Sequence, residues 1–203
     1  MSGAEVSDLI AAVLEDYPQA VKVEGGEEVV LRPAGAADMA AIVAFAGELT
    51  EQDLLFLRVD ITQQSVVENW LSNVANGQTV SLLACQDERV VGYCTVDRNP
   101  ARWTRRVGEI RVNVVPQMRS RGLGRHMTSK IFDVARRIGL RKLIAHMTPD
   151  QVGAQAAFAR LGFRPEALLT DYIEDRDGDV HDLAIMTYDM DGFNAQVDVP
   201  LQV

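Results

Sequence analysis

Residues 108–125 of the chain read GEIRVNVVPQMRSRGLGR and contain a strand, a basic loop and the start of a helix. Apolar and polar side chains alternate from Glu109 to Val114, which is the period of two typical of a half-buried strand. Pro116 ends the strand because it has no N–H group to give to a neighbouring strand. Leu123 begins a helical pattern. Its further apolar positions are Met127, Ile131, Val134, Ala135 and Ile138.

The loop between this strand and this helix has the features of an anion-binding site. The first turn of a helix carries unpaired N–H groups and the positive end of the helix dipole. Gly122 and Gly124 allow the backbone to approach a ligand closely. Arg119, Arg121 and Arg125 supply forked donors for phosphate oxygens, so a diphosphate fits the loop better than a carboxylate.

Two common phosphate-binding loops are excluded. A P-loop requires Gly-Lys followed by Ser or Thr, whereas Gly124 is followed by Arg125. The dinucleotide fingerprint requires another glycine where this chain has Met127. The remaining pattern, Arg119-x-x-Gly122-x-Gly124, resembles the CoA-pyrophosphate loop of the GNAT superfamily of acyl-CoA N-acyltransferases. Taken alone, the loop also fits an ordinary strand–helix turn with solvated arginines.

A second stretch strengthens the resemblance. Residues 150–163 read DQVGAQAAFARLGF, and helical spacing predicts that Val152, Ala156 and Leu161, or small residues near them, face inward. Gly162 is expected to cap this helix at its C-terminus, after which the chain enters a strand. The segment is similar to the GNAT helix that ends in a Leu-Gly-Phe turn.

Size and composition set limits on the function. The 203 residues are enough for one domain, and acidic residues outnumber basic ones by 29 to 20. A net charge of -9 disfavours nucleic acid as a partner and mildly favours a cationic substrate. No apolar run approaches the roughly 18 residues of a membrane-spanning helix, so we expect no membrane association.

The start of the chain and its thiols indicate a cytoplasmic protein. The first 19 residues carry acidic side chains where a secretion signal would be basic. Cys85 and Cys94 lie in apolar strand-like runs and are expected to be buried thiols in a reducing compartment. The three histidines show no metal-ligand spacing, so no metal site is expected.

The pattern along the chain predicts one catalytic domain with two flanking segments. Residues 1–26 are expected to form a helix and a linker, and the helix is expected to pack on the domain or on a second subunit, which leaves a homodimer open. Residues 27–190 read β-α-α-β-β-β-α-β-α-β-β, an α/β order that is also the GNAT order. Residues 191–203 are expected to be a tail.

The resemblance implies a fold and a way of binding acetyl-CoA. GNAT proteins have a mixed, mostly antiparallel sheet flanked by helices, and two splayed central strands hold pantetheine between them. By resemblance, acetyl-CoA is the co-substrate here. The residues expected to contact it are Val112, Val114, Val115, Arg119, Ser120, Arg121, Gly122, Leu123, Gly124, Arg125, Gln151 and Phe158.

Glu109 is the candidate general base, because it falls where several lysine acetyltransferases of the superfamily carry theirs. A lysine-type amine has a pKa of about 10.4, so a proton must be removed before it attacks a thioester. A water relay is as plausible as direct contact at this position. The alternative is a surface ion pair with Arg111 on the same strand face. Asp171, Asp175 and Asp179 are competing carboxylates, or else solvated turn residues and acceptor contacts.

The chain departs from the family pattern at two positions. Phe158 stands where many members have a tyrosine that protonates the leaving thiolate, and Gln151 stands where many have asparagine. Tyr172 is an alternative acid. Taken together with the LRPAGAADM and LTEQDLLFLR segments, these features are nearest to the GNAT domain of bacterial Pat-type protein lysine acetyltransferases.

The expected acceptor is a primary amine, with a protein lysine ahead of a polyamine, aminoglycoside or amino acid. Acidic side chains in the 49–58 connection and in the last hairpin would attract it, with Asp171 and Tyr172 as substrate contacts. The apolar residues 54–57 are expected either to face a partner protein or to pack into the domain. A catalytically silent acyl-CoA-binding module is the alternative from another class of function.

Overall fold

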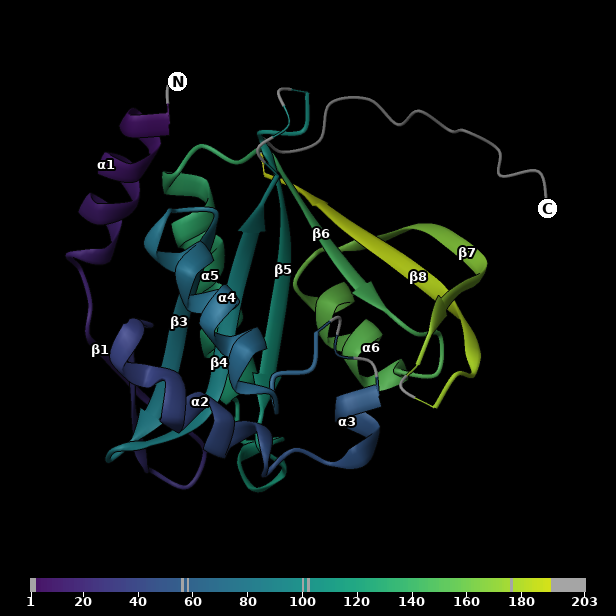
Figure 1. The fold of residues 1–203 in the computed structure, drawn as a ribbon, viewed down its shortest axis with the longest axis horizontal. Coiled ribbons are helices and arrows are strands. Elements are labelled where there is room, and N and C mark those ends of the chain that lie inside the picture. The colour runs from purple at the N-terminus through teal and green to yellow at the C-terminus, as the bar shows by residue number, and fades with distance from the viewer. Residues whose placement is uncertain are drawn as a thin grey trace.

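The computed structural model describes residues 3–55, 57, 59–99, 101, 103–175 and 177–190. Within these residues the chain forms an eight-stranded sheet with helices on both faces (Figure 1). The strands are β1 (Gln19–Lys22), β2 (Glu28–Pro33), β3 (Thr79–Gln86), β4 (Arg89–Arg98), β5 (Val107–Val114), β6 (Lys142–Met147), β7 (Arg164–Glu174) and β8 (Val180–Asp189). The α-helices are α1 (Gly3–Leu14), α2 (Met39–Ala46), α3 (Glu51–Leu55), α4 (Gln64–Ala75), α5 (Leu123–Arg137) and α6 (Val152–Arg160).

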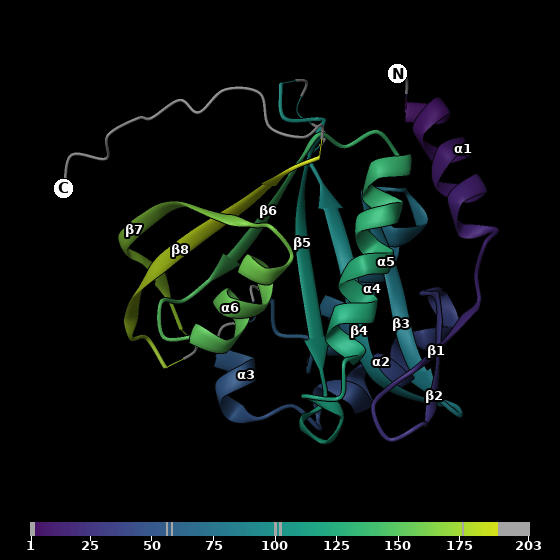
Figure 2. The same cartoon turned by 180° about the vertical axis from the view of Figure 1, so that it is seen from behind.

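The sheet order is β1-β2-β3-β4-β5-β6-β8-β7. Neighbouring strands pair antiparallel throughout this order except at one junction, where β5 and β6 run parallel. The predicted mixed, mostly antiparallel α/β sheet is therefore confirmed. The parallel junction requires a crossover, and α5 provides it on the sheet face opposite α2 and α4 (Figure 2).

Packing of the helices is set by their apolar faces. The buried positions of α5 include Met127, Ile131 and Val134, which are members of the predicted inward set. Helix α1 packs beside α5, and Arg137 of α5 bonds Asp16 at 2.5 Å (Figure 2). The side chains of α1 that join the common core are Val6, Ile10 and Val13. This confirms the alternative in which the N-terminal helix packs on the domain.

The sequence analysis did not predict β1. The sheet begins at Gln19, in the segment that was expected to be a linker. This strand has four residues, of which Val21 is buried, so it is too short to show a period. The expectation that Val152 faces inward is also wrong, since this side chain is 68% exposed. Val152 is the first residue of α6, and the helix contacts the core further along, through Ala154, Phe158 and Leu161.

Other details agree with the sequence. Cys85 and Cys94 are both free and buried, as expected. Gly162 has φ +95° after α6, which is the left-handed conformation expected of a C-terminal cap. In the 49–58 connection, Leu54 and Leu57 pack partly buried against the core, whereas Phe56 lies outside the described residues. Among helices of the described chain, none is long and apolar enough to cross a membrane.

Candidate active site

The two central strands separate in the middle of the sheet. Strand β5 pairs with β6 only over Val107–Glu109 opposite Lys142–Ile144. Beyond Glu109, β5 continues to Val114 beside β4, while the rest of β6 pairs with β8. In Figure 1 the two strands lie together at the top and diverge toward the bottom. This is the predicted splay.

Backbone groups of β5 face the opening. In an antiparallel pair, hydrogen-bonded and non-hydrogen-bonded residues alternate, and Val115 N–H donates to Val91 O at 3.0 Å. The alternation turns the backbone groups of Val112 and Val114 toward β6, as predicted for pantetheine contacts. Val115 does not fit that prediction, because its N–H is bonded to Val91 and its C=O accepts from Met118 N at 3.0 Å.

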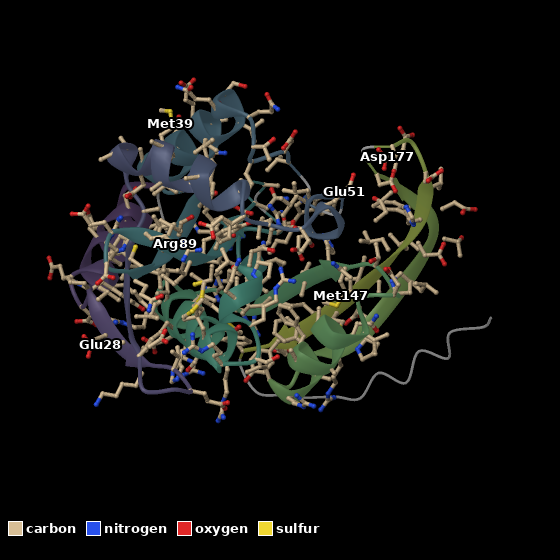
Figure 3. The ribbon with its side chains drawn as sticks, turned by 90° about the horizontal axis from the view of Figure 1, so that it is seen from below. Glu28, Met39, Glu51, Arg89, Met147 and Asp177 are labelled. Carbon is tan, nitrogen blue, oxygen red and sulfur yellow. The ribbon has the colours of Figure 1, made fainter. Side chains whose placement is uncertain are left out.

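A cavity of about 700 Å³ occupies the opening. The predicted residues Val112, Gln151, Phe158 and Tyr172 all line it. Phe158 also packs edge-on against Phe163, with ring centroids 4.9 Å apart, so it is at once a wall of the cavity and part of the core. Helix α3 (Glu51), the end of β6 (Met147) and the hairpin tip (Asp177) lie together on one side of the molecule in Figure 3.

The glycine loop lies at the end of β5, outside this cavity. Gly122 has φ +80° and is the N-cap of α5, with no side chain to accept from the first-turn N–H groups. A Cβ atom at Gly122 would meet nothing within 4 Å, and one at Gly124 would meet only Val114 Cγ2, at 4.0 Å. Packing within the described protein therefore does not require glycine at 124. The Leu123 side chain is fully buried, which leaves its backbone as the group that can face a ligand.

Two of the three loop arginines form internal ion pairs. Arg119 Nη2 lies 2.5 Å from Asp53 Oδ2, and Arg119 Nε donates to Val114 O at 3.1 Å. Arg121 Nη2 lies 2.9 Å from Glu27 Oε1. Within the described residues, Arg125 forms none of the ion pairs found. The sequence predicted the basic loop but not these carboxylate partners, which come from distant segments.

A second cavity, of about 680 Å³, lies against the α4 side of the sheet. Its lining includes Trp70, Asp97 and Arg98. Three of its polar atoms are buried without a hydrogen-bond partner among the described residues: Thr95 Oγ1, Arg98 Nε and Thr104 Oγ1. Such atoms are the ones that a polar ligand or water satisfies. The residues common to both cavities are Asn99, Glu109, Arg111 and His146.

Glu109 is central to this junction. Its Oε1 atom lies 2.5 Å from Arg111 Nη2 and 3.4 Å from His146 Nδ1. Arg111 also reaches Asp97 Oδ2 at 3.4 Å, which makes a half-buried network of charges. Burial alone would raise the pKa of Glu109, but the hydrogen bond from His146 and the charge of Arg111 outweigh it and lower this pKa to about 2. The ion pair between Glu109 and Arg111, which was the alternative interpretation of Glu109, is present.

Two residues of the site were not predicted. His146 enters both cavities from β6 and is brought to Glu109 by the parallel pairing of β5 with β6. Thr148, just after β6, is 1% exposed and lines the opening. Its hydroxyl has no hydrogen-bond partner among the described residues. A single threonine before Pro149 gives no sequence signal for this role.

The acidic hairpin residues are placed differently from the cavity residues. Asp175 accepts from the backbone N–H groups of Asp177 and Asp179 and lies 2.7 Å from His181 Nε2, so it organises the turn. The backbone N–H of Asp171 donates to Asp182 Oδ1 at 2.9 Å, and neither cavity is lined by Asp171. Of the two predicted substrate contacts, Asp171 and Tyr172, only Tyr172 lines a cavity, and the acidic residues Asp53 and Glu174 line the same one. No metal-binding cluster of three ligands occurs among the described residues.

Comparison with known proteins agrees with this geometry. Residues 48–163, more than half of the chain, match the model of the acetyltransferase (GNAT) family. No curated protein sequence matches significantly.

Several solved structures have the same fold. A GNAT-family acetyltransferase of Streptococcus pneumoniae aligns with a TM-score of 0.70 at 19% identity, over 80% of this chain and 99% of that one. The GNAT domain of S. lividans PAT aligns with a TM-score of 0.70 at 18% identity, over 85% and 97%. The YncA protein of Salmonella typhimurium, solved with acetyl-CoA, aligns with a TM-score of 0.70 at 22% identity, over 82% and 96%.

The acetyl-CoA requirement of the family fits the residues present. Backbone groups at the opening between β5 and β6 would hold the pantetheine amides, and the α5 N-terminus at Gly122 and Gly124 would hold the pyrophosphate. The chain is an acyltransferase with acetyl-CoA as co-substrate, and it belongs to the GNAT acetyltransferase family.

Proposed function

We propose that the protein transfers the acetyl group of acetyl-CoA to a primary amine by direct attack, at the junction between its two cavities. The observation that carries this is that Asn99, Glu109, Arg111 and His146 line both cavities. Acetyl-CoA occupies the opening between β5 and β6. The amine reaches the thioester from the cavity beside α4.

The charges at the junction suit an ammonium group. Asp97 and Glu109 lie at the guanidinium of Arg111, and their two carboxylates are groups in this cavity that can bind an ammonium. Arg98 also lines the cavity and balances the second carboxylate, so attraction of a cationic acceptor depends on its direct contact with Asp97 and Glu109. Glu109 is proposed as the carboxylate on which removal of the ammonium proton depends.

The acceptor that we put first is a protein lysine. Its long side chain reaches into a deep cavity while its backbone stays outside, and the acidic surface of the chain favours basic neighbours. A free polyamine, aminoglycoside or amino acid is the second candidate. The orphan Arg98 Nε favours it, because a free amino acid offers a carboxylate to this atom. The cytoplasmic location and a homodimer stay predictions.

The experiment has two arms. Release of CoA from acetyl-CoA is measured with spermidine, kanamycin, lysine and a lysine-containing peptide, and labelled acetyl-CoA is incubated with the protein and cell extract. A protein-lysine enzyme labels a few protein bands, less at high salt, and the label is found on lysine side chains. Fast turnover of a small amine with no labelled band would replace the first acceptor by the second. CoA binding without turnover in either arm would identify a silent binding module.

A further inference from the structure

The proton of the attacking amine needs an acceptor at the junction, and Glu109 by itself is a poor one. Arg111 and His146 hold the carboxylate as an anion, with a pKa of about 2. Moving a proton from an amine of pKa about 10.4 to such a group is strongly uphill. A general base works best when its pKa lies nearer to the working pH.

We propose that the Nε2 atom of His146 accepts the amine proton and that Glu109 positions this histidine; the proposal rests on the acetyl transfer proposed above. Nδ1 of His146 lies 3.4 Å from Glu109 Oε1. In the neutral tautomer that carries its hydrogen on Nδ1, Nδ1 donates toward the Glu109 carboxylate. Nε2 then has a free lone pair that can accept a proton. The contact is longer than an ideal hydrogen bond and shortens when substrate fills the site, as catalytic contacts do.

The surroundings of His146 suit a group that must exchange protons. Its side chain is 35% exposed, whereas that of Glu109 is 15% exposed, so His146 can pass a proton on to solvent. Charged groups that line the same cavities are Glu109, Arg111 and Asp97 on the sheet, Arg98 at the end of β4, Asp53 on α3 and Glu174 on β7. Strand β8 places Ile185 opposite His146 and adds no charge there.

The step balances as follows. The ammonium gives one proton to Nε2, and the neutral amine nitrogen forms a bond to the thioester carbon. The C–S bond breaks and CoA leaves as a thiolate, while the nitrogen loses its second proton, which ends on the CoA sulfur through water. The imidazolium releases the first proton to solvent. The products are an acetamide, CoA and one proton.

The test compares variants of the full chain with acetyl-CoA and whichever of spermidine or the lysine peptide the wild type acetylates faster. His146→Ala is expected to lower kcat by about 10²–10⁴-fold with little change in the KM for acetyl-CoA. Added imidazole is expected to restore part of the kcat of this variant. Without imidazole, the fall of kcat at low pH that the wild type shows is expected to be absent from the variant. In Glu109→Gln, the side-chain oxygen can still accept a hydrogen bond from His146 Nδ1. The kcat of this variant is therefore expected to fall less, by about tenfold, and added imidazole is not expected to raise it.

His181→Ala is the matched control, because His181 is also partly exposed (33%) and lies 2.7 Å from a carboxylate, that of Asp175. It is expected to retain kcat within about twofold. His146→Gln covers the case in which the alanine variant is poorly folded. If kcat and the acid limb survive both His146 changes while Glu109→Gln abolishes turnover, the proposal is overturned and Glu109 is the base. A wild-type protein that acetylates no amine would refute the proposed function itself.

Discussion

His146 Nδ1 lies 3.4 Å from Glu109 Oε1, across the point where β6 turns away from β5. The two strands are parallel there, and parallel strands need a long crossover connection. Glu109 and His146 are therefore far apart in sequence although they are close in space. The contact lies where the cavity between β5 and β6 meets the cavity beside α4. The position of this pair links the architecture of the sheet to the proposed chemistry.

The glycine loop gives a prediction about CoA binding. Gly124→Val is expected to lower CoA affinity at least tenfold with little change in the melting temperature, because an added Cβ atom meets only Val114 Cγ2, at 4.0 Å, whereas a bound pyrophosphate would lie against the new side chain. Gly122→Val is expected to lose affinity and also to unfold more easily. A branched residue at the φ of +80° found at Gly122 lowers the free energy of unfolding by about 1–2 kcal/mol. Calorimetric titration and thermal unfolding check both. Unchanged affinity in Gly124→Val would refute this loop as the pyrophosphate site.

The ion pair between Arg119 and Asp53 gives a second prediction. Asp53→Asn frees the guanidinium for phosphate, so CoA is expected to bind a few times more tightly at low salt and equally at high salt. Arg119→Gln is expected to bind CoA more weakly. Arg137→Gln is the control, since Arg137 forms a similar exposed pair with Asp16 on α1's side of the molecule and should not change CoA affinity. Weaker CoA binding in Asp53→Asn would mean that the pair itself holds the site together.

The depressed pKa of Glu109 predicts how stability depends on pH. The folded-state pKa of about 2 lies below the ordinary value of 4.5, so this group stabilises the fold above pH 4.5 and loses that contribution as pH falls to 2. The contribution is at most about 3 kcal/mol. Urea unfolding of wild type and Glu109→Gln should therefore differ most near neutral pH and converge near pH 2. A difference that does not depend on pH would contradict the assignment.

Thr148 gives a prediction about the co-substrate. Thr148→Val keeps the shape of a side chain that is 1% exposed and removes the orphan hydroxyl, so stability is expected to be unchanged or higher. If the hydroxyl bonds acetyl-CoA, the KM for acetyl-CoA rises or kcat falls by about tenfold, the equivalent of one hydrogen bond. Thr128→Val is the control, because its hydroxyl donates within α5 to Gly124 O at 2.7 Å. Wild-type kinetics in Thr148→Val would exclude the hydroxyl from the site.

The sequence predicted the parts of the fold that have strong local patterns. Helix α5 begins at Leu123, where the helical spacing of apolar residues starts, and Gly162 caps α6. Strand β1 was missed because four residues show no period, and its pairing with β2 decides its structure. For the site, the glycine loop and Glu109 have sequence signals. His146 and Asp53 have none, because their partners are set by strand pairing and by the placement of α3.

A crystal structure of the protein with acetyl-CoA would show where the thioester lies. We expect pantetheine in the opening between β5 and β6, bonded to the backbone of Val112, with the pyrophosphate over Gly122 and Gly124. The thioester carbon is expected to lie at the junction of the two cavities, where Glu109 and His146 meet. Density for acetyl-CoA elsewhere, or a thioester that lies away from this pair, would contradict the account.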